Sequence, residues 1–207
     1  MAMLGNGYSV RIPRVVGVRL TGALPPGAMP TDLVLTITNR LRDFGVVGAF
    51  VEFFGSGLAA LSVADRATIA NMAPEYGATI GFFPIDDKTI DYLTQSGREN
   101  AQIALVEAYA KASGLFSFAG DIDADYSDII DIDLSSIRPS LAGPKRPQDL
   151  VALDDISNSF RKTLTTDTQD GGFGLTETAL AETASFTLAG TNHTLTHGSI
   201  VIAAITS

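Results

Sequence analysis

The sequence contains no cysteine and only two histidines among its 207 residues. Without thiols, the chain alone cannot form a disulfide framework, a zinc ribbon, a thiolate-held iron–sulfur cluster or a cysteine nucleophile. Two histidines cannot build a three-histidine metal site, although histidine combined with carboxylates could. These shortages exclude several classes of metalloprotein, and we expect no metal to be bound by this chain alone.

Positive charge is also scarce, with 14 Lys and Arg residues against 23 Asp and Glu residues and a formal net charge of −9. Because contact with phosphate groups depends mainly on Lys and Arg, this balance argues against a general nucleic-acid binder or a binder of anionic membranes. Charged residues make up 18% of the chain, below the roughly 25% of an average domain, while hydrophobic residues make up 45%. The low charged fraction is a first indication that part of the surface is covered by something else.

Long hydrophobic runs are missing. The run Ile200–Ile205 is six residues long, whereas a membrane-spanning helix needs about 20 apolar residues. The N-terminal stretch MAMLGNGYSVRIPR has no apolar segment of the kind found in secretory signals. We therefore expect a cytoplasmic protein with no membrane-spanning segment.

Buried strands alternate with helices in the first half of the sequence. β-Branched and aromatic runs predict strands at Val15–Leu20, Val46–Phe54 and Thr79–Phe83. Four helices are predicted from their start signals, at Thr31, Ser62, Asp86 and Glu99. Strands that are apolar on both faces and separated by helices are typical of a parallel sheet, so we predict an α/β fold with a mainly parallel sheet and flanking helices.

The character of the sequence changes after Leu115. Residues 121–133 contain six aspartates, and residues 163–194 are rich in Thr and Gly and poorly patterned. We therefore expect one compact βαβ domain over residues 1–117 and an incomplete second α/β unit over residues 118–207.

Two strands are predicted beyond this boundary, at Ile129–Leu134 and Ser199–Ile205, with a Pro- and Gly-rich loop at Arg138–Gln148 between them. The last strand resembles the central strand of a parallel sheet. Ligands of open α/β sheets bind just beyond the carboxyl ends of strands, so a site is expected to follow this strand.

An aspartate-rich turn imitates the opening of a calcium-binding loop at Asp121, Asp123 and Asp125. The sixth loop position requires glycine and is Tyr126, and the twelfth requires glutamate and is Ile132. A solvated acidic turn that leads into a strand is the better interpretation.

Two further patterns are too incomplete to define a site. The loop Gly143–Arg146 lacks the Gly-Lys-Ser/Thr ending of a phosphate-binding loop, although its basic pair could contact a phosphate or carboxylate. His193 and His197 lie among Thr, Asn and Gly just before a strand, so presentation on one helical face, and with it a metal pair, is doubtful.

Asn71 and Glu75 lie four residues apart near the end of a predicted helix. On a regular helix they would share a face, but Pro74 and Gly77 predict that the helix ends or kinks between them. The helix macrodipole disfavours a glutamate near a helix C-terminus. This placement is a weak indication of a specific partner for Glu75, the alternative being a solvated side chain.

The stretch Gly45–Asp86, GVVGAFVEFFGSGLAALSVADRATIANMAPEYGATIGFFPID, resembles the aconitase family, in its branch of bacterial aconitases and iron-regulatory proteins. Supporting segments are MLGNGYSVRIPRVVGVRLTG at Met3–Gly22, TDLVLTITNRLR at Thr31–Arg42, DYLTQSGR at Asp91–Arg98, AGPKRPQD at Ala142–Asp149 and HGSIVIAAITS at His197–Ser207. The resemblance extends over nearly the whole chain and is weakest across residues 150–190.

The resemblance implies a segment of a larger hydro-lyase. The family's enzymes interconvert citrate and isocitrate through cis-aconitate, and they use a [4Fe–4S] cluster, held by three cysteines, as a Lewis acid. Residues 1–117 resemble the second domain, and residues 118–207 resemble the beginning of the third. In the family the first cluster cysteine follows the sequence Ile-Thr-Ser, which here ends at Ser207, so the resemblance implies no cluster on this chain and no activity in isolation.

The resemblance also assigns roles to two candidate catalytic residues, because Asn71–Glu75 matches the family's Asn-Met-x-x-Glu element. It implies that Asn71 faces the cluster and donates its amide to a sulfur atom, which tunes the cluster. It implies that Glu75 pairs with a histidine of the first domain and helps to hold the iron-bound water. The implied partners are the remaining domains of the enzyme and a tricarboxylate substrate.

Three alternatives are weighed against this interpretation. A 2-methylcitrate dehydratase-type relative shares much of the same region, and the high apolar content also suits a non-catalytic module that docks onto partner chains. RNA binding, as in the iron-regulatory relatives, is disfavoured by the net charge of −9.

Overall fold

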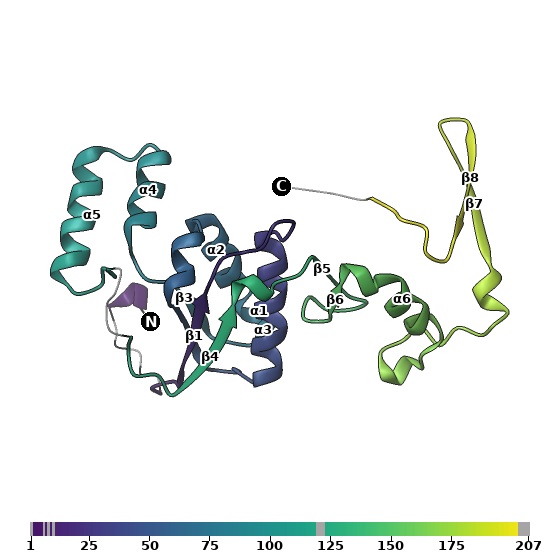
Figure 1. Cartoon of the computed structure of the whole chain (residues 1–207), viewed down its shortest axis with the longest axis horizontal. Helices are drawn as coiled ribbons and strands as arrows, with labels where there is room; N and C mark the ends of the chain where they lie inside the picture. The colour runs from purple at the N-terminus through teal and green to yellow at the C-terminus, as the bar shows by residue number, and fades with distance from the viewer. Residues whose placement is uncertain (1, 6, 8, 10, 119–122, 203–207) are drawn as a thin grey trace.

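The computed structural model describes residues 2–5, 7, 9, 11–118 and 123–202, which form an elongated molecule around one α/β unit (Figure 1). The main sheet of this unit has four parallel strands in the order β3-β2-β1-β4. The strands are β1 (Val15–Thr21), β2 (Phe50–Phe54), β3 (Ile80–Phe82) and β4 (Asp128–Asp133). The predicted α/β fold with a mainly parallel sheet is confirmed.

Helices connect the parallel strands. They are α1 (Pro30–Phe44), α2 (Val63–Asn71), α3 (Ala73–Tyr76), α4 (Asp87–Gln95) and α5 (Asn100–Ala112). Helix α1 begins one residue before the predicted start, because Pro30 suits the first helical position and the Asp32 carboxylate accepts a hydrogen bond from the Met29 N–H at 2.7 Å. No helix in the described ranges is long and apolar enough to cross a membrane.

The hydrophobic core lies between one face of the sheet and the helices α1 to α3. Along β1, Val16, Val18 and Leu20 alternate with residues of the other face and are fully buried. The facing stripe of α1 consists of Leu33, Ile37 and Leu41. Burying each such side chain contributes about 1.5–3 kcal/mol, so this layer of contacts stabilises the fold.

Strand β4 joins the sheet from beyond the boundary expected at residues 117/118. It pairs in parallel with β1 along its whole length. Ile132, Leu134 and Ile137 then contribute to the same hydrophobic core as β1 and α1. The sheet and its core therefore continue to Ile137, and the aspartate-rich segment leads into a strand of the first unit.

The opposite face of the sheet is only partly covered. Tyr126 stacks on Phe54 with ring centroids 4.8 Å apart, and it packs so closely on Gly17 that a Cβ there would lie 2.5 Å from the tyrosine ring. On the same face Phe82 is 46% exposed and Ile129 43% exposed. Parallel sheets are usually buried on both faces, so this exposure is unusual.

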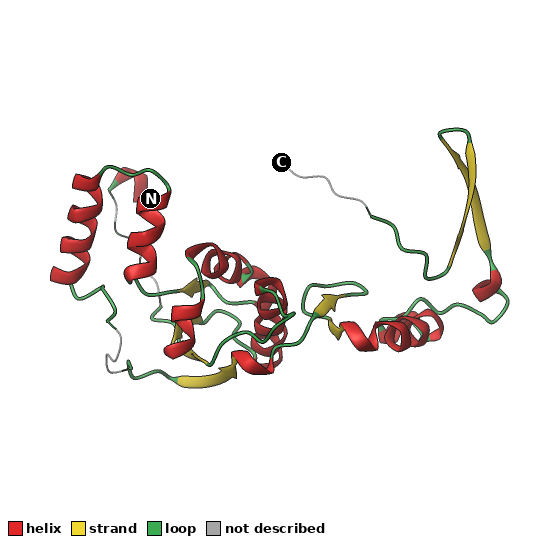
Figure 2. Cartoon of the chain, turned by 45° about the horizontal axis from the view of Figure 1, so that its top comes forward, coloured by secondary structure: helices red, strands yellow, loops and turns green. Residues whose placement is uncertain are grey.

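Smaller elements follow Ile137. They are the antiparallel pair β5 (Ser140–Ala142) and β6 (Leu150–Ala152), helix α6 (Ile156–Thr165), and the hairpin of β7 (Thr183–Leu188) and β8 (Thr191–Thr196). The hairpin projects away from the rest of the chain (Figure 2). Short 3-10 turns are η1 (Ala2–Leu4), η2 (Ser56–Ala60), η3 (Leu134–Ser136), η4 (Leu153–Asp155), η5 (Thr168–Asp170) and η6 (Ala179–Ala181).

Two predictions for this part of the chain need correction. The segment Arg138–Gln148, predicted as a loop, contains strand β5. The strand predicted at Ser199–Ile205 does not form over residues 199–202, and its last residues lie outside the described part. An apolar run becomes a strand only where a neighbouring strand is present to pair with it, and residues 199–202 have none.

Helix α2 begins where the sequence predicts it, with a capping box formed by Ser62 and Asp65. The Asp65 N–H donates to Ser62 Oγ at 3.2 Å, and the Ser62 N–H donates to the Asp65 carboxylate at 2.9 Å. Because Ser62→Ala removes the first of these bonds, we expect it to lower the free energy of unfolding by about 1 kcal/mol in chemical denaturation. Ser62→Thr keeps the hydroxyl and should lower the free energy of unfolding much less. Equal decreases in the two variants would contradict the capping role.

Candidate functional site

The predicted site residues Asn71 and Glu75 lie on either side of a break in the helix. Helix α2 ends at Asn71, Met72 follows with φ −84° and ψ 9°, and Glu75 is the third residue of the four-residue helix α3. Pro74 lies in the first turn of α3, where its missing N–H is tolerated, and Gly77 ends the helix at φ +92°. The predicted break is confirmed, so the two residues do not share the face of one regular helix.

This break lies at the edge where the parallel strands begin. The Gly48 N–H donates to the Gly77 carbonyl at 3.2 Å, and the Thr79 N–H donates to the Ala49 carbonyl at 2.8 Å. These bonds fix the end of α3 beside the residues that lead into β2 and β3. Ligands of open α/β sheets usually bind at the opposite edge, so a site at Asn71 and Glu75 is not a strand-end site of this sheet.

Glu75 is half-buried, and its Oε2 atom is buried without a hydrogen-bond partner in the part of the chain that the structure describes. Buried carboxylate oxygens are normally hydrogen-bonded, and leaving one unpaired costs about 1–3 kcal/mol or more. Glu75 Oε2 can therefore accept a hydrogen bond, and no described residue donates one.

Asn71 is exposed, and its side-chain amide makes no hydrogen bond to another described residue. A free amide offers two N–H donors and one carbonyl acceptor. The break therefore presents a donor group on one side and an unpaired carboxylate oxygen on the other.

Tyr76 follows Glu75 and is fully buried, with its hydroxyl donating to the Ile69 carbonyl at 3.3 Å. Burial raises the pKa of this hydroxyl, and the negative charge of Glu75 raises it further. The protonated form is therefore favoured in the folded state over the unfolded state. The resulting stabilisation is complete below the unfolded pKa of about 10 and is lost as the pH rises above it.

We accordingly expect the free energy of unfolding to fall as the pH rises above about 10, and to fall less steeply in Tyr76→Phe. Chemical denaturation at a series of alkaline pH values measures both slopes. Tyr92→Phe is the matched control, because Tyr92 is 49% exposed and its loss should leave the slope unchanged. Equal slopes for Tyr76→Phe and the unmodified chain would contradict the prediction.

No metal-binding group emerges among the described residues, where no three His, Asp or Glu side chains are placed to hold an ion. His193 on β8 stacks on Phe186 with ring centroids 5.3 Å apart, and His197 Nε2 lies 3.0 Å from the Ala179 carbonyl oxygen. The calcium-like turn includes Asp121, which lies outside the described residues. Since the sequence also has no cysteine, the thiolates of any associated iron–sulfur cluster must come from elsewhere.

Two features of the structure were not predicted. Arg66 and Asp86 form a buried bidentate ion pair between α2 and the start of α4. The sequence feature that could have indicated this ion pair is Arg66 itself, a charged residue three positions before Ile69 on the buried side of α2. The second feature is that Lys162 of α6 lines a cavity together with the basic pair of the β5–β6 loop.

Comparison with known proteins matches the whole chain, residues 1–207, to the aconitase family (aconitate hydratase). The chain is 55% identical over 206 residues to aconitate hydratase A of Thermus thermophilus, covering 99% of this chain and 23% of the relative. It is 50% identical over 205 residues to aconitate hydratase A of Deinococcus radiodurans, covering 99% of this chain and 22% of that relative. The corresponding protein of Rickettsia bellii is 51% identical over 206 residues, which are 100% of this chain and 22% of the relative. The chain, which spans less than a quarter of the length of these relatives, belongs to the aconitase family.

Proposed function

We propose that the chain is a segment of an aconitate hydratase, the hydro-lyase that interconverts citrate and isocitrate through cis-aconitate in the tricarboxylic acid cycle, and that it is inactive in isolation. The proposal is carried by the 55% identity to the Thermus aconitate hydratase A over 206 residues. The names of these relatives favour a citrate and isocitrate enzyme over the 2-methylcitrate alternative. We place the parent enzyme in the cytoplasm.

The division into domains stays part of this proposal. The resemblance sets the boundary between the second domain of the family's enzymes, over residues 1–117, and the beginning of the third, over residues 118–207. The pairing of β4 with β1, and the burial of Leu134 and Ile137 in the first core, favour a boundary near Ile137.

The proposed roles of Asn71 and Glu75 use the donor and the acceptor at the helix break. When bound, a [4Fe–4S] cluster supplies a Lewis acid for the hydroxyl and carboxylate of the tricarboxylate substrate. Asn71, with its free amide, donates a hydrogen bond to a cluster sulfur. Glu75, with its unpaired oxygen, accepts a hydrogen bond from a histidine of another domain and fixes its orientation.

A hybrid enzyme tests this proposal. We expect the Thermus relative to keep aconitate hydratase activity when its matching 206-residue segment is replaced by this chain, because more than half of the positions are identical. Formation of cis-aconitate, followed by absorbance after anaerobic iron–sulfur reconstitution, is the measurement. The chain alone should show neither cluster absorbance nor turnover. A folded hybrid without activity, or turnover by the chain alone, would refute the proposal.

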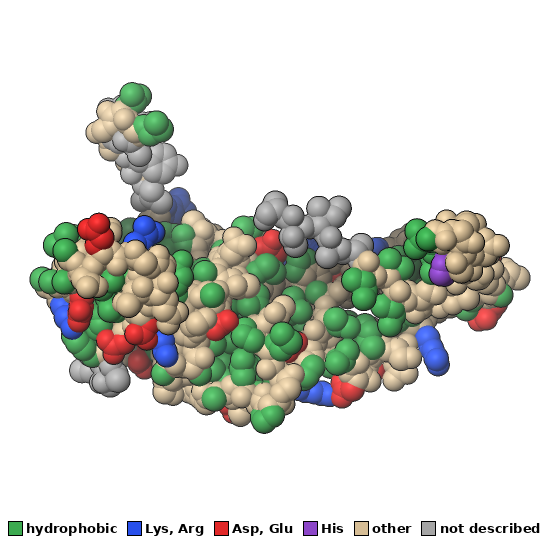
Figure 3. All heavy atoms as spheres, turned by 90° about the horizontal axis from the view of Figure 1, so that it is seen from above, with side chains coloured by type: hydrophobic (Ala, Val, Ile, Leu, Met, Phe, Trp, Pro, Cys, Tyr) green, Lys and Arg blue, Asp and Glu red, His purple; other side chains and the backbone are tan. Residues whose placement is uncertain are grey.

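A docking module without catalytic function is the second candidate, and exposed apolar side chains favour it. Helix α5 exposes Leu105 by 68% and Tyr109 by 67%, and hydrophobic side chains are spread over the face shown in Figure 3. Surfaces of this kind mark contact with another protein surface. The same surfaces would be covered by neighbouring domains in the full enzyme, so activity of the hybrid separates the two candidates.

A further inference from the structure

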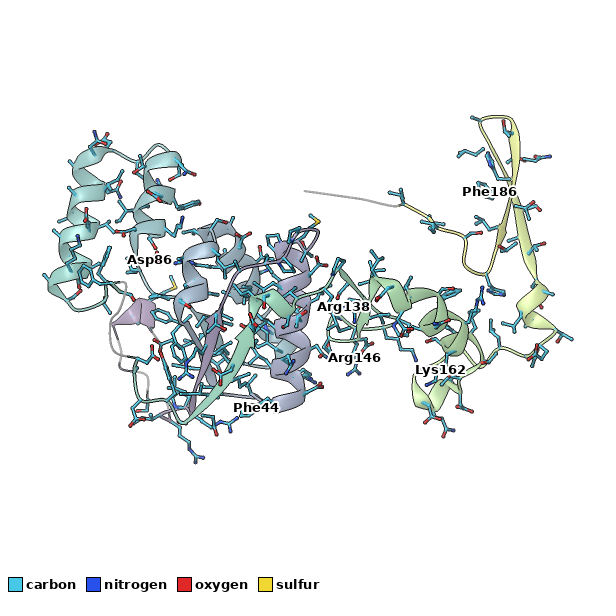
Figure 4. The ribbon with its side chains drawn as sticks, in the orientation of Figure 1. Phe44, Asp86, Arg138, Arg146, Lys162 and Phe186 are labelled. Atoms are coloured by element: carbon cyan, nitrogen blue, oxygen red, sulfur yellow. The ribbon has the colours of Figure 1, made fainter. Side chains whose placement is uncertain are left out.

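A cavity of about 760 Å³ lies between the loop that joins β5 to β6 and helix α6 with the turn that follows it. Figure 4 labels Arg146 on the loop and Lys162 on the helix. The loop is closed by its own hydrogen bonds, from the Gly143 N–H to the Asp149 carbonyl at 2.8 Å and from the Asp149 N–H to the Arg146 carbonyl at 3.0 Å. Two separate elements, one of them fixed by internal bonds, therefore form the walls.

Positive charge gathers in this cavity. Lys145, Arg146 and Lys162 line it, and none of the three forms an ion pair within the described ranges of the chain. The whole chain has a net charge of −9, so three unpaired cations in one hollow are a local exception. A concave surface with an excess of positive charge attracts anions.

The acidic groups of the cavity compete only weakly for these cations. Asp149 Oδ2 accepts hydrogen bonds from the backbone N–H groups of Arg146 at 3.0 Å and Lys145 at 3.3 Å, so this carboxylate serves the loop itself. Among the residues that the structure describes, Asp170 is the only other acidic residue that lines the cavity. The described lining thus carries three cations and two carboxylates, and one of these carboxylates, Asp149, is bound to the backbone of the loop.

Neutral donors complete the lining. Ser159, Gln148 and Gln169 line the cavity, and their side chains make no hydrogen bond to another described residue. Hydroxyl and amide groups beside Lys and Arg are the groups that hold oxyanions, because each adds an N–H or O–H donor to the charge.

We infer that this cavity binds a small polyvalent oxyanion, either a phosphate ester or a polycarboxylate, whose charged oxygens are held by Lys145, Arg146 and Lys162. Arginine offers a planar pair of donors to a carboxylate or phosphate, and the two lysines add point charges. The inference does not rest on the proposed function, since it uses only the lining of this cavity.

Titration of the full 207-residue chain with inorganic phosphate and, separately, with citrate tests the inference by NMR at constant ionic strength. We expect saturable shifts of the backbone amides of Lys145, Arg146, Gln148 and Asp149 and of residues 162–172 with at least one of the two anions. Saturation by phosphate alone would identify the ligand as a phosphate ester, and saturation by citrate alone would identify it as a polycarboxylate. Saturation by both would show that the cavity recognises the oxyanion chemistry that the two share. Chloride at matched ionic strength should produce no saturable shift.

Variants locate the site. Arg146→Gln combined with Lys162→Gln should weaken binding by about tenfold or more, because charge-assisted hydrogen bonds contribute on this scale. Arg146→Lys keeps the charge and should retain most of the affinity. Lys111→Gln, a cation on α5 outside the cavity, should bind like the unmodified chain. Absence of saturation with both anions, or equal affinity in the double variant with an unchanged spectrum elsewhere, would overturn the inference.

Discussion

Asp86→Asn is expected to lower the free energy of unfolding by roughly 3–5 kcal/mol, because it leaves a buried guanidinium without its counter-charge. Arg66 Nη1 and Nη2 donate to the two carboxylate oxygens of Asp86 at 2.9 and 2.8 Å, and Nη2 also donates to the Leu58 carbonyl at 2.9 Å. The side chain of Arg66 is only 4% exposed. Arg66 Nε is buried without a partner among the described residues, so one donor of the guanidinium is unsatisfied even before Asp86 is changed.

The choice of asparagine isolates this charge. Asp86 also caps helix α4 by accepting a hydrogen bond from the Thr89 N–H at 3.3 Å, and asparagine caps helices as well as aspartate does. Asp154→Asn is the matched control, since the Arg138–Asp154 pair is 63% and 68% exposed and should contribute less than about 1 kcal/mol. Urea unfolding followed by circular dichroism compares the two variants. Similar small losses in both would contradict the role assigned to the buried pair.

A second substitution distinguishes a lost attraction from an unpaired charge. Adding Arg66→Met to Asp86→Asn removes the buried charge itself, so the double variant should be more stable than Asp86→Asn alone. Arg66 belongs to α2, whose last residue is Asn71, and Asp86 begins α4. The ion pair therefore also fixes the helix that presents one half of the candidate site.

Local sequence patterns predicted the elements whose causes are local. Strand β1 follows from its run of β-branched residues, and the capping box at Ser62 and Asp65 fixes the start of α2. The break after Asn71 follows from Pro74 and Gly77, whose backbone restrictions act within a few residues. Such features need no knowledge of the rest of the chain.

Long-range pairing could not be predicted in the same way. The segment before β4 changes in composition, and six aspartates suggested a new unit, yet β4 pairs with β1 more than a hundred residues earlier in the chain. Alternation along β4 gave no information about its neighbour, because register depends on which strand offers an apolar face. The same limit explains why the apolar run at Ser199 predicted a strand that does not form over the described residues.

The sequence predicted which two residues form the candidate site, but it did not predict their burial or their hydrogen bonding. Sequence spacing and the resemblance singled out Asn71 and Glu75, and the structure adds that one is free and exposed while the other holds a buried, unpaired oxygen. The partner of Arg66 lies twenty residues further along the chain, and the cations of the cavity come from a loop and a helix. Residues that are distant in the sequence and adjacent only in the folded chain cannot be paired from local sequence patterns.

Glu75→Gln should lower activity without lowering stability. In the isolated chain the substitution removes a half-buried charge whose Oε2 has no partner, so the free energy of unfolding should stay the same or rise by about 1 kcal/mol. In the hybrid with the Thermus relative, the same substitution replaces the charged carboxylate proposed to orient a histidine by a neutral amide, which is a weaker acceptor. We expect kcat to fall by about 100-fold or more, with KM less affected, because a positioned proton-transfer group contributes on this scale.

Glu107→Gln is the matched control, because Glu107 lies on α5 with 38% of its side chain exposed and pairs with Lys111 four residues away. It should change the free energy of unfolding by less than about 0.5 kcal/mol and leave kcat unchanged. Urea denaturation of the isolated chain and absorbance assays of the hybrid give the two readouts. A structural glutamate would lower stability and activity together, so a clear loss of stability in Glu75→Gln would assign Glu75 to the scaffold and remove it from the site.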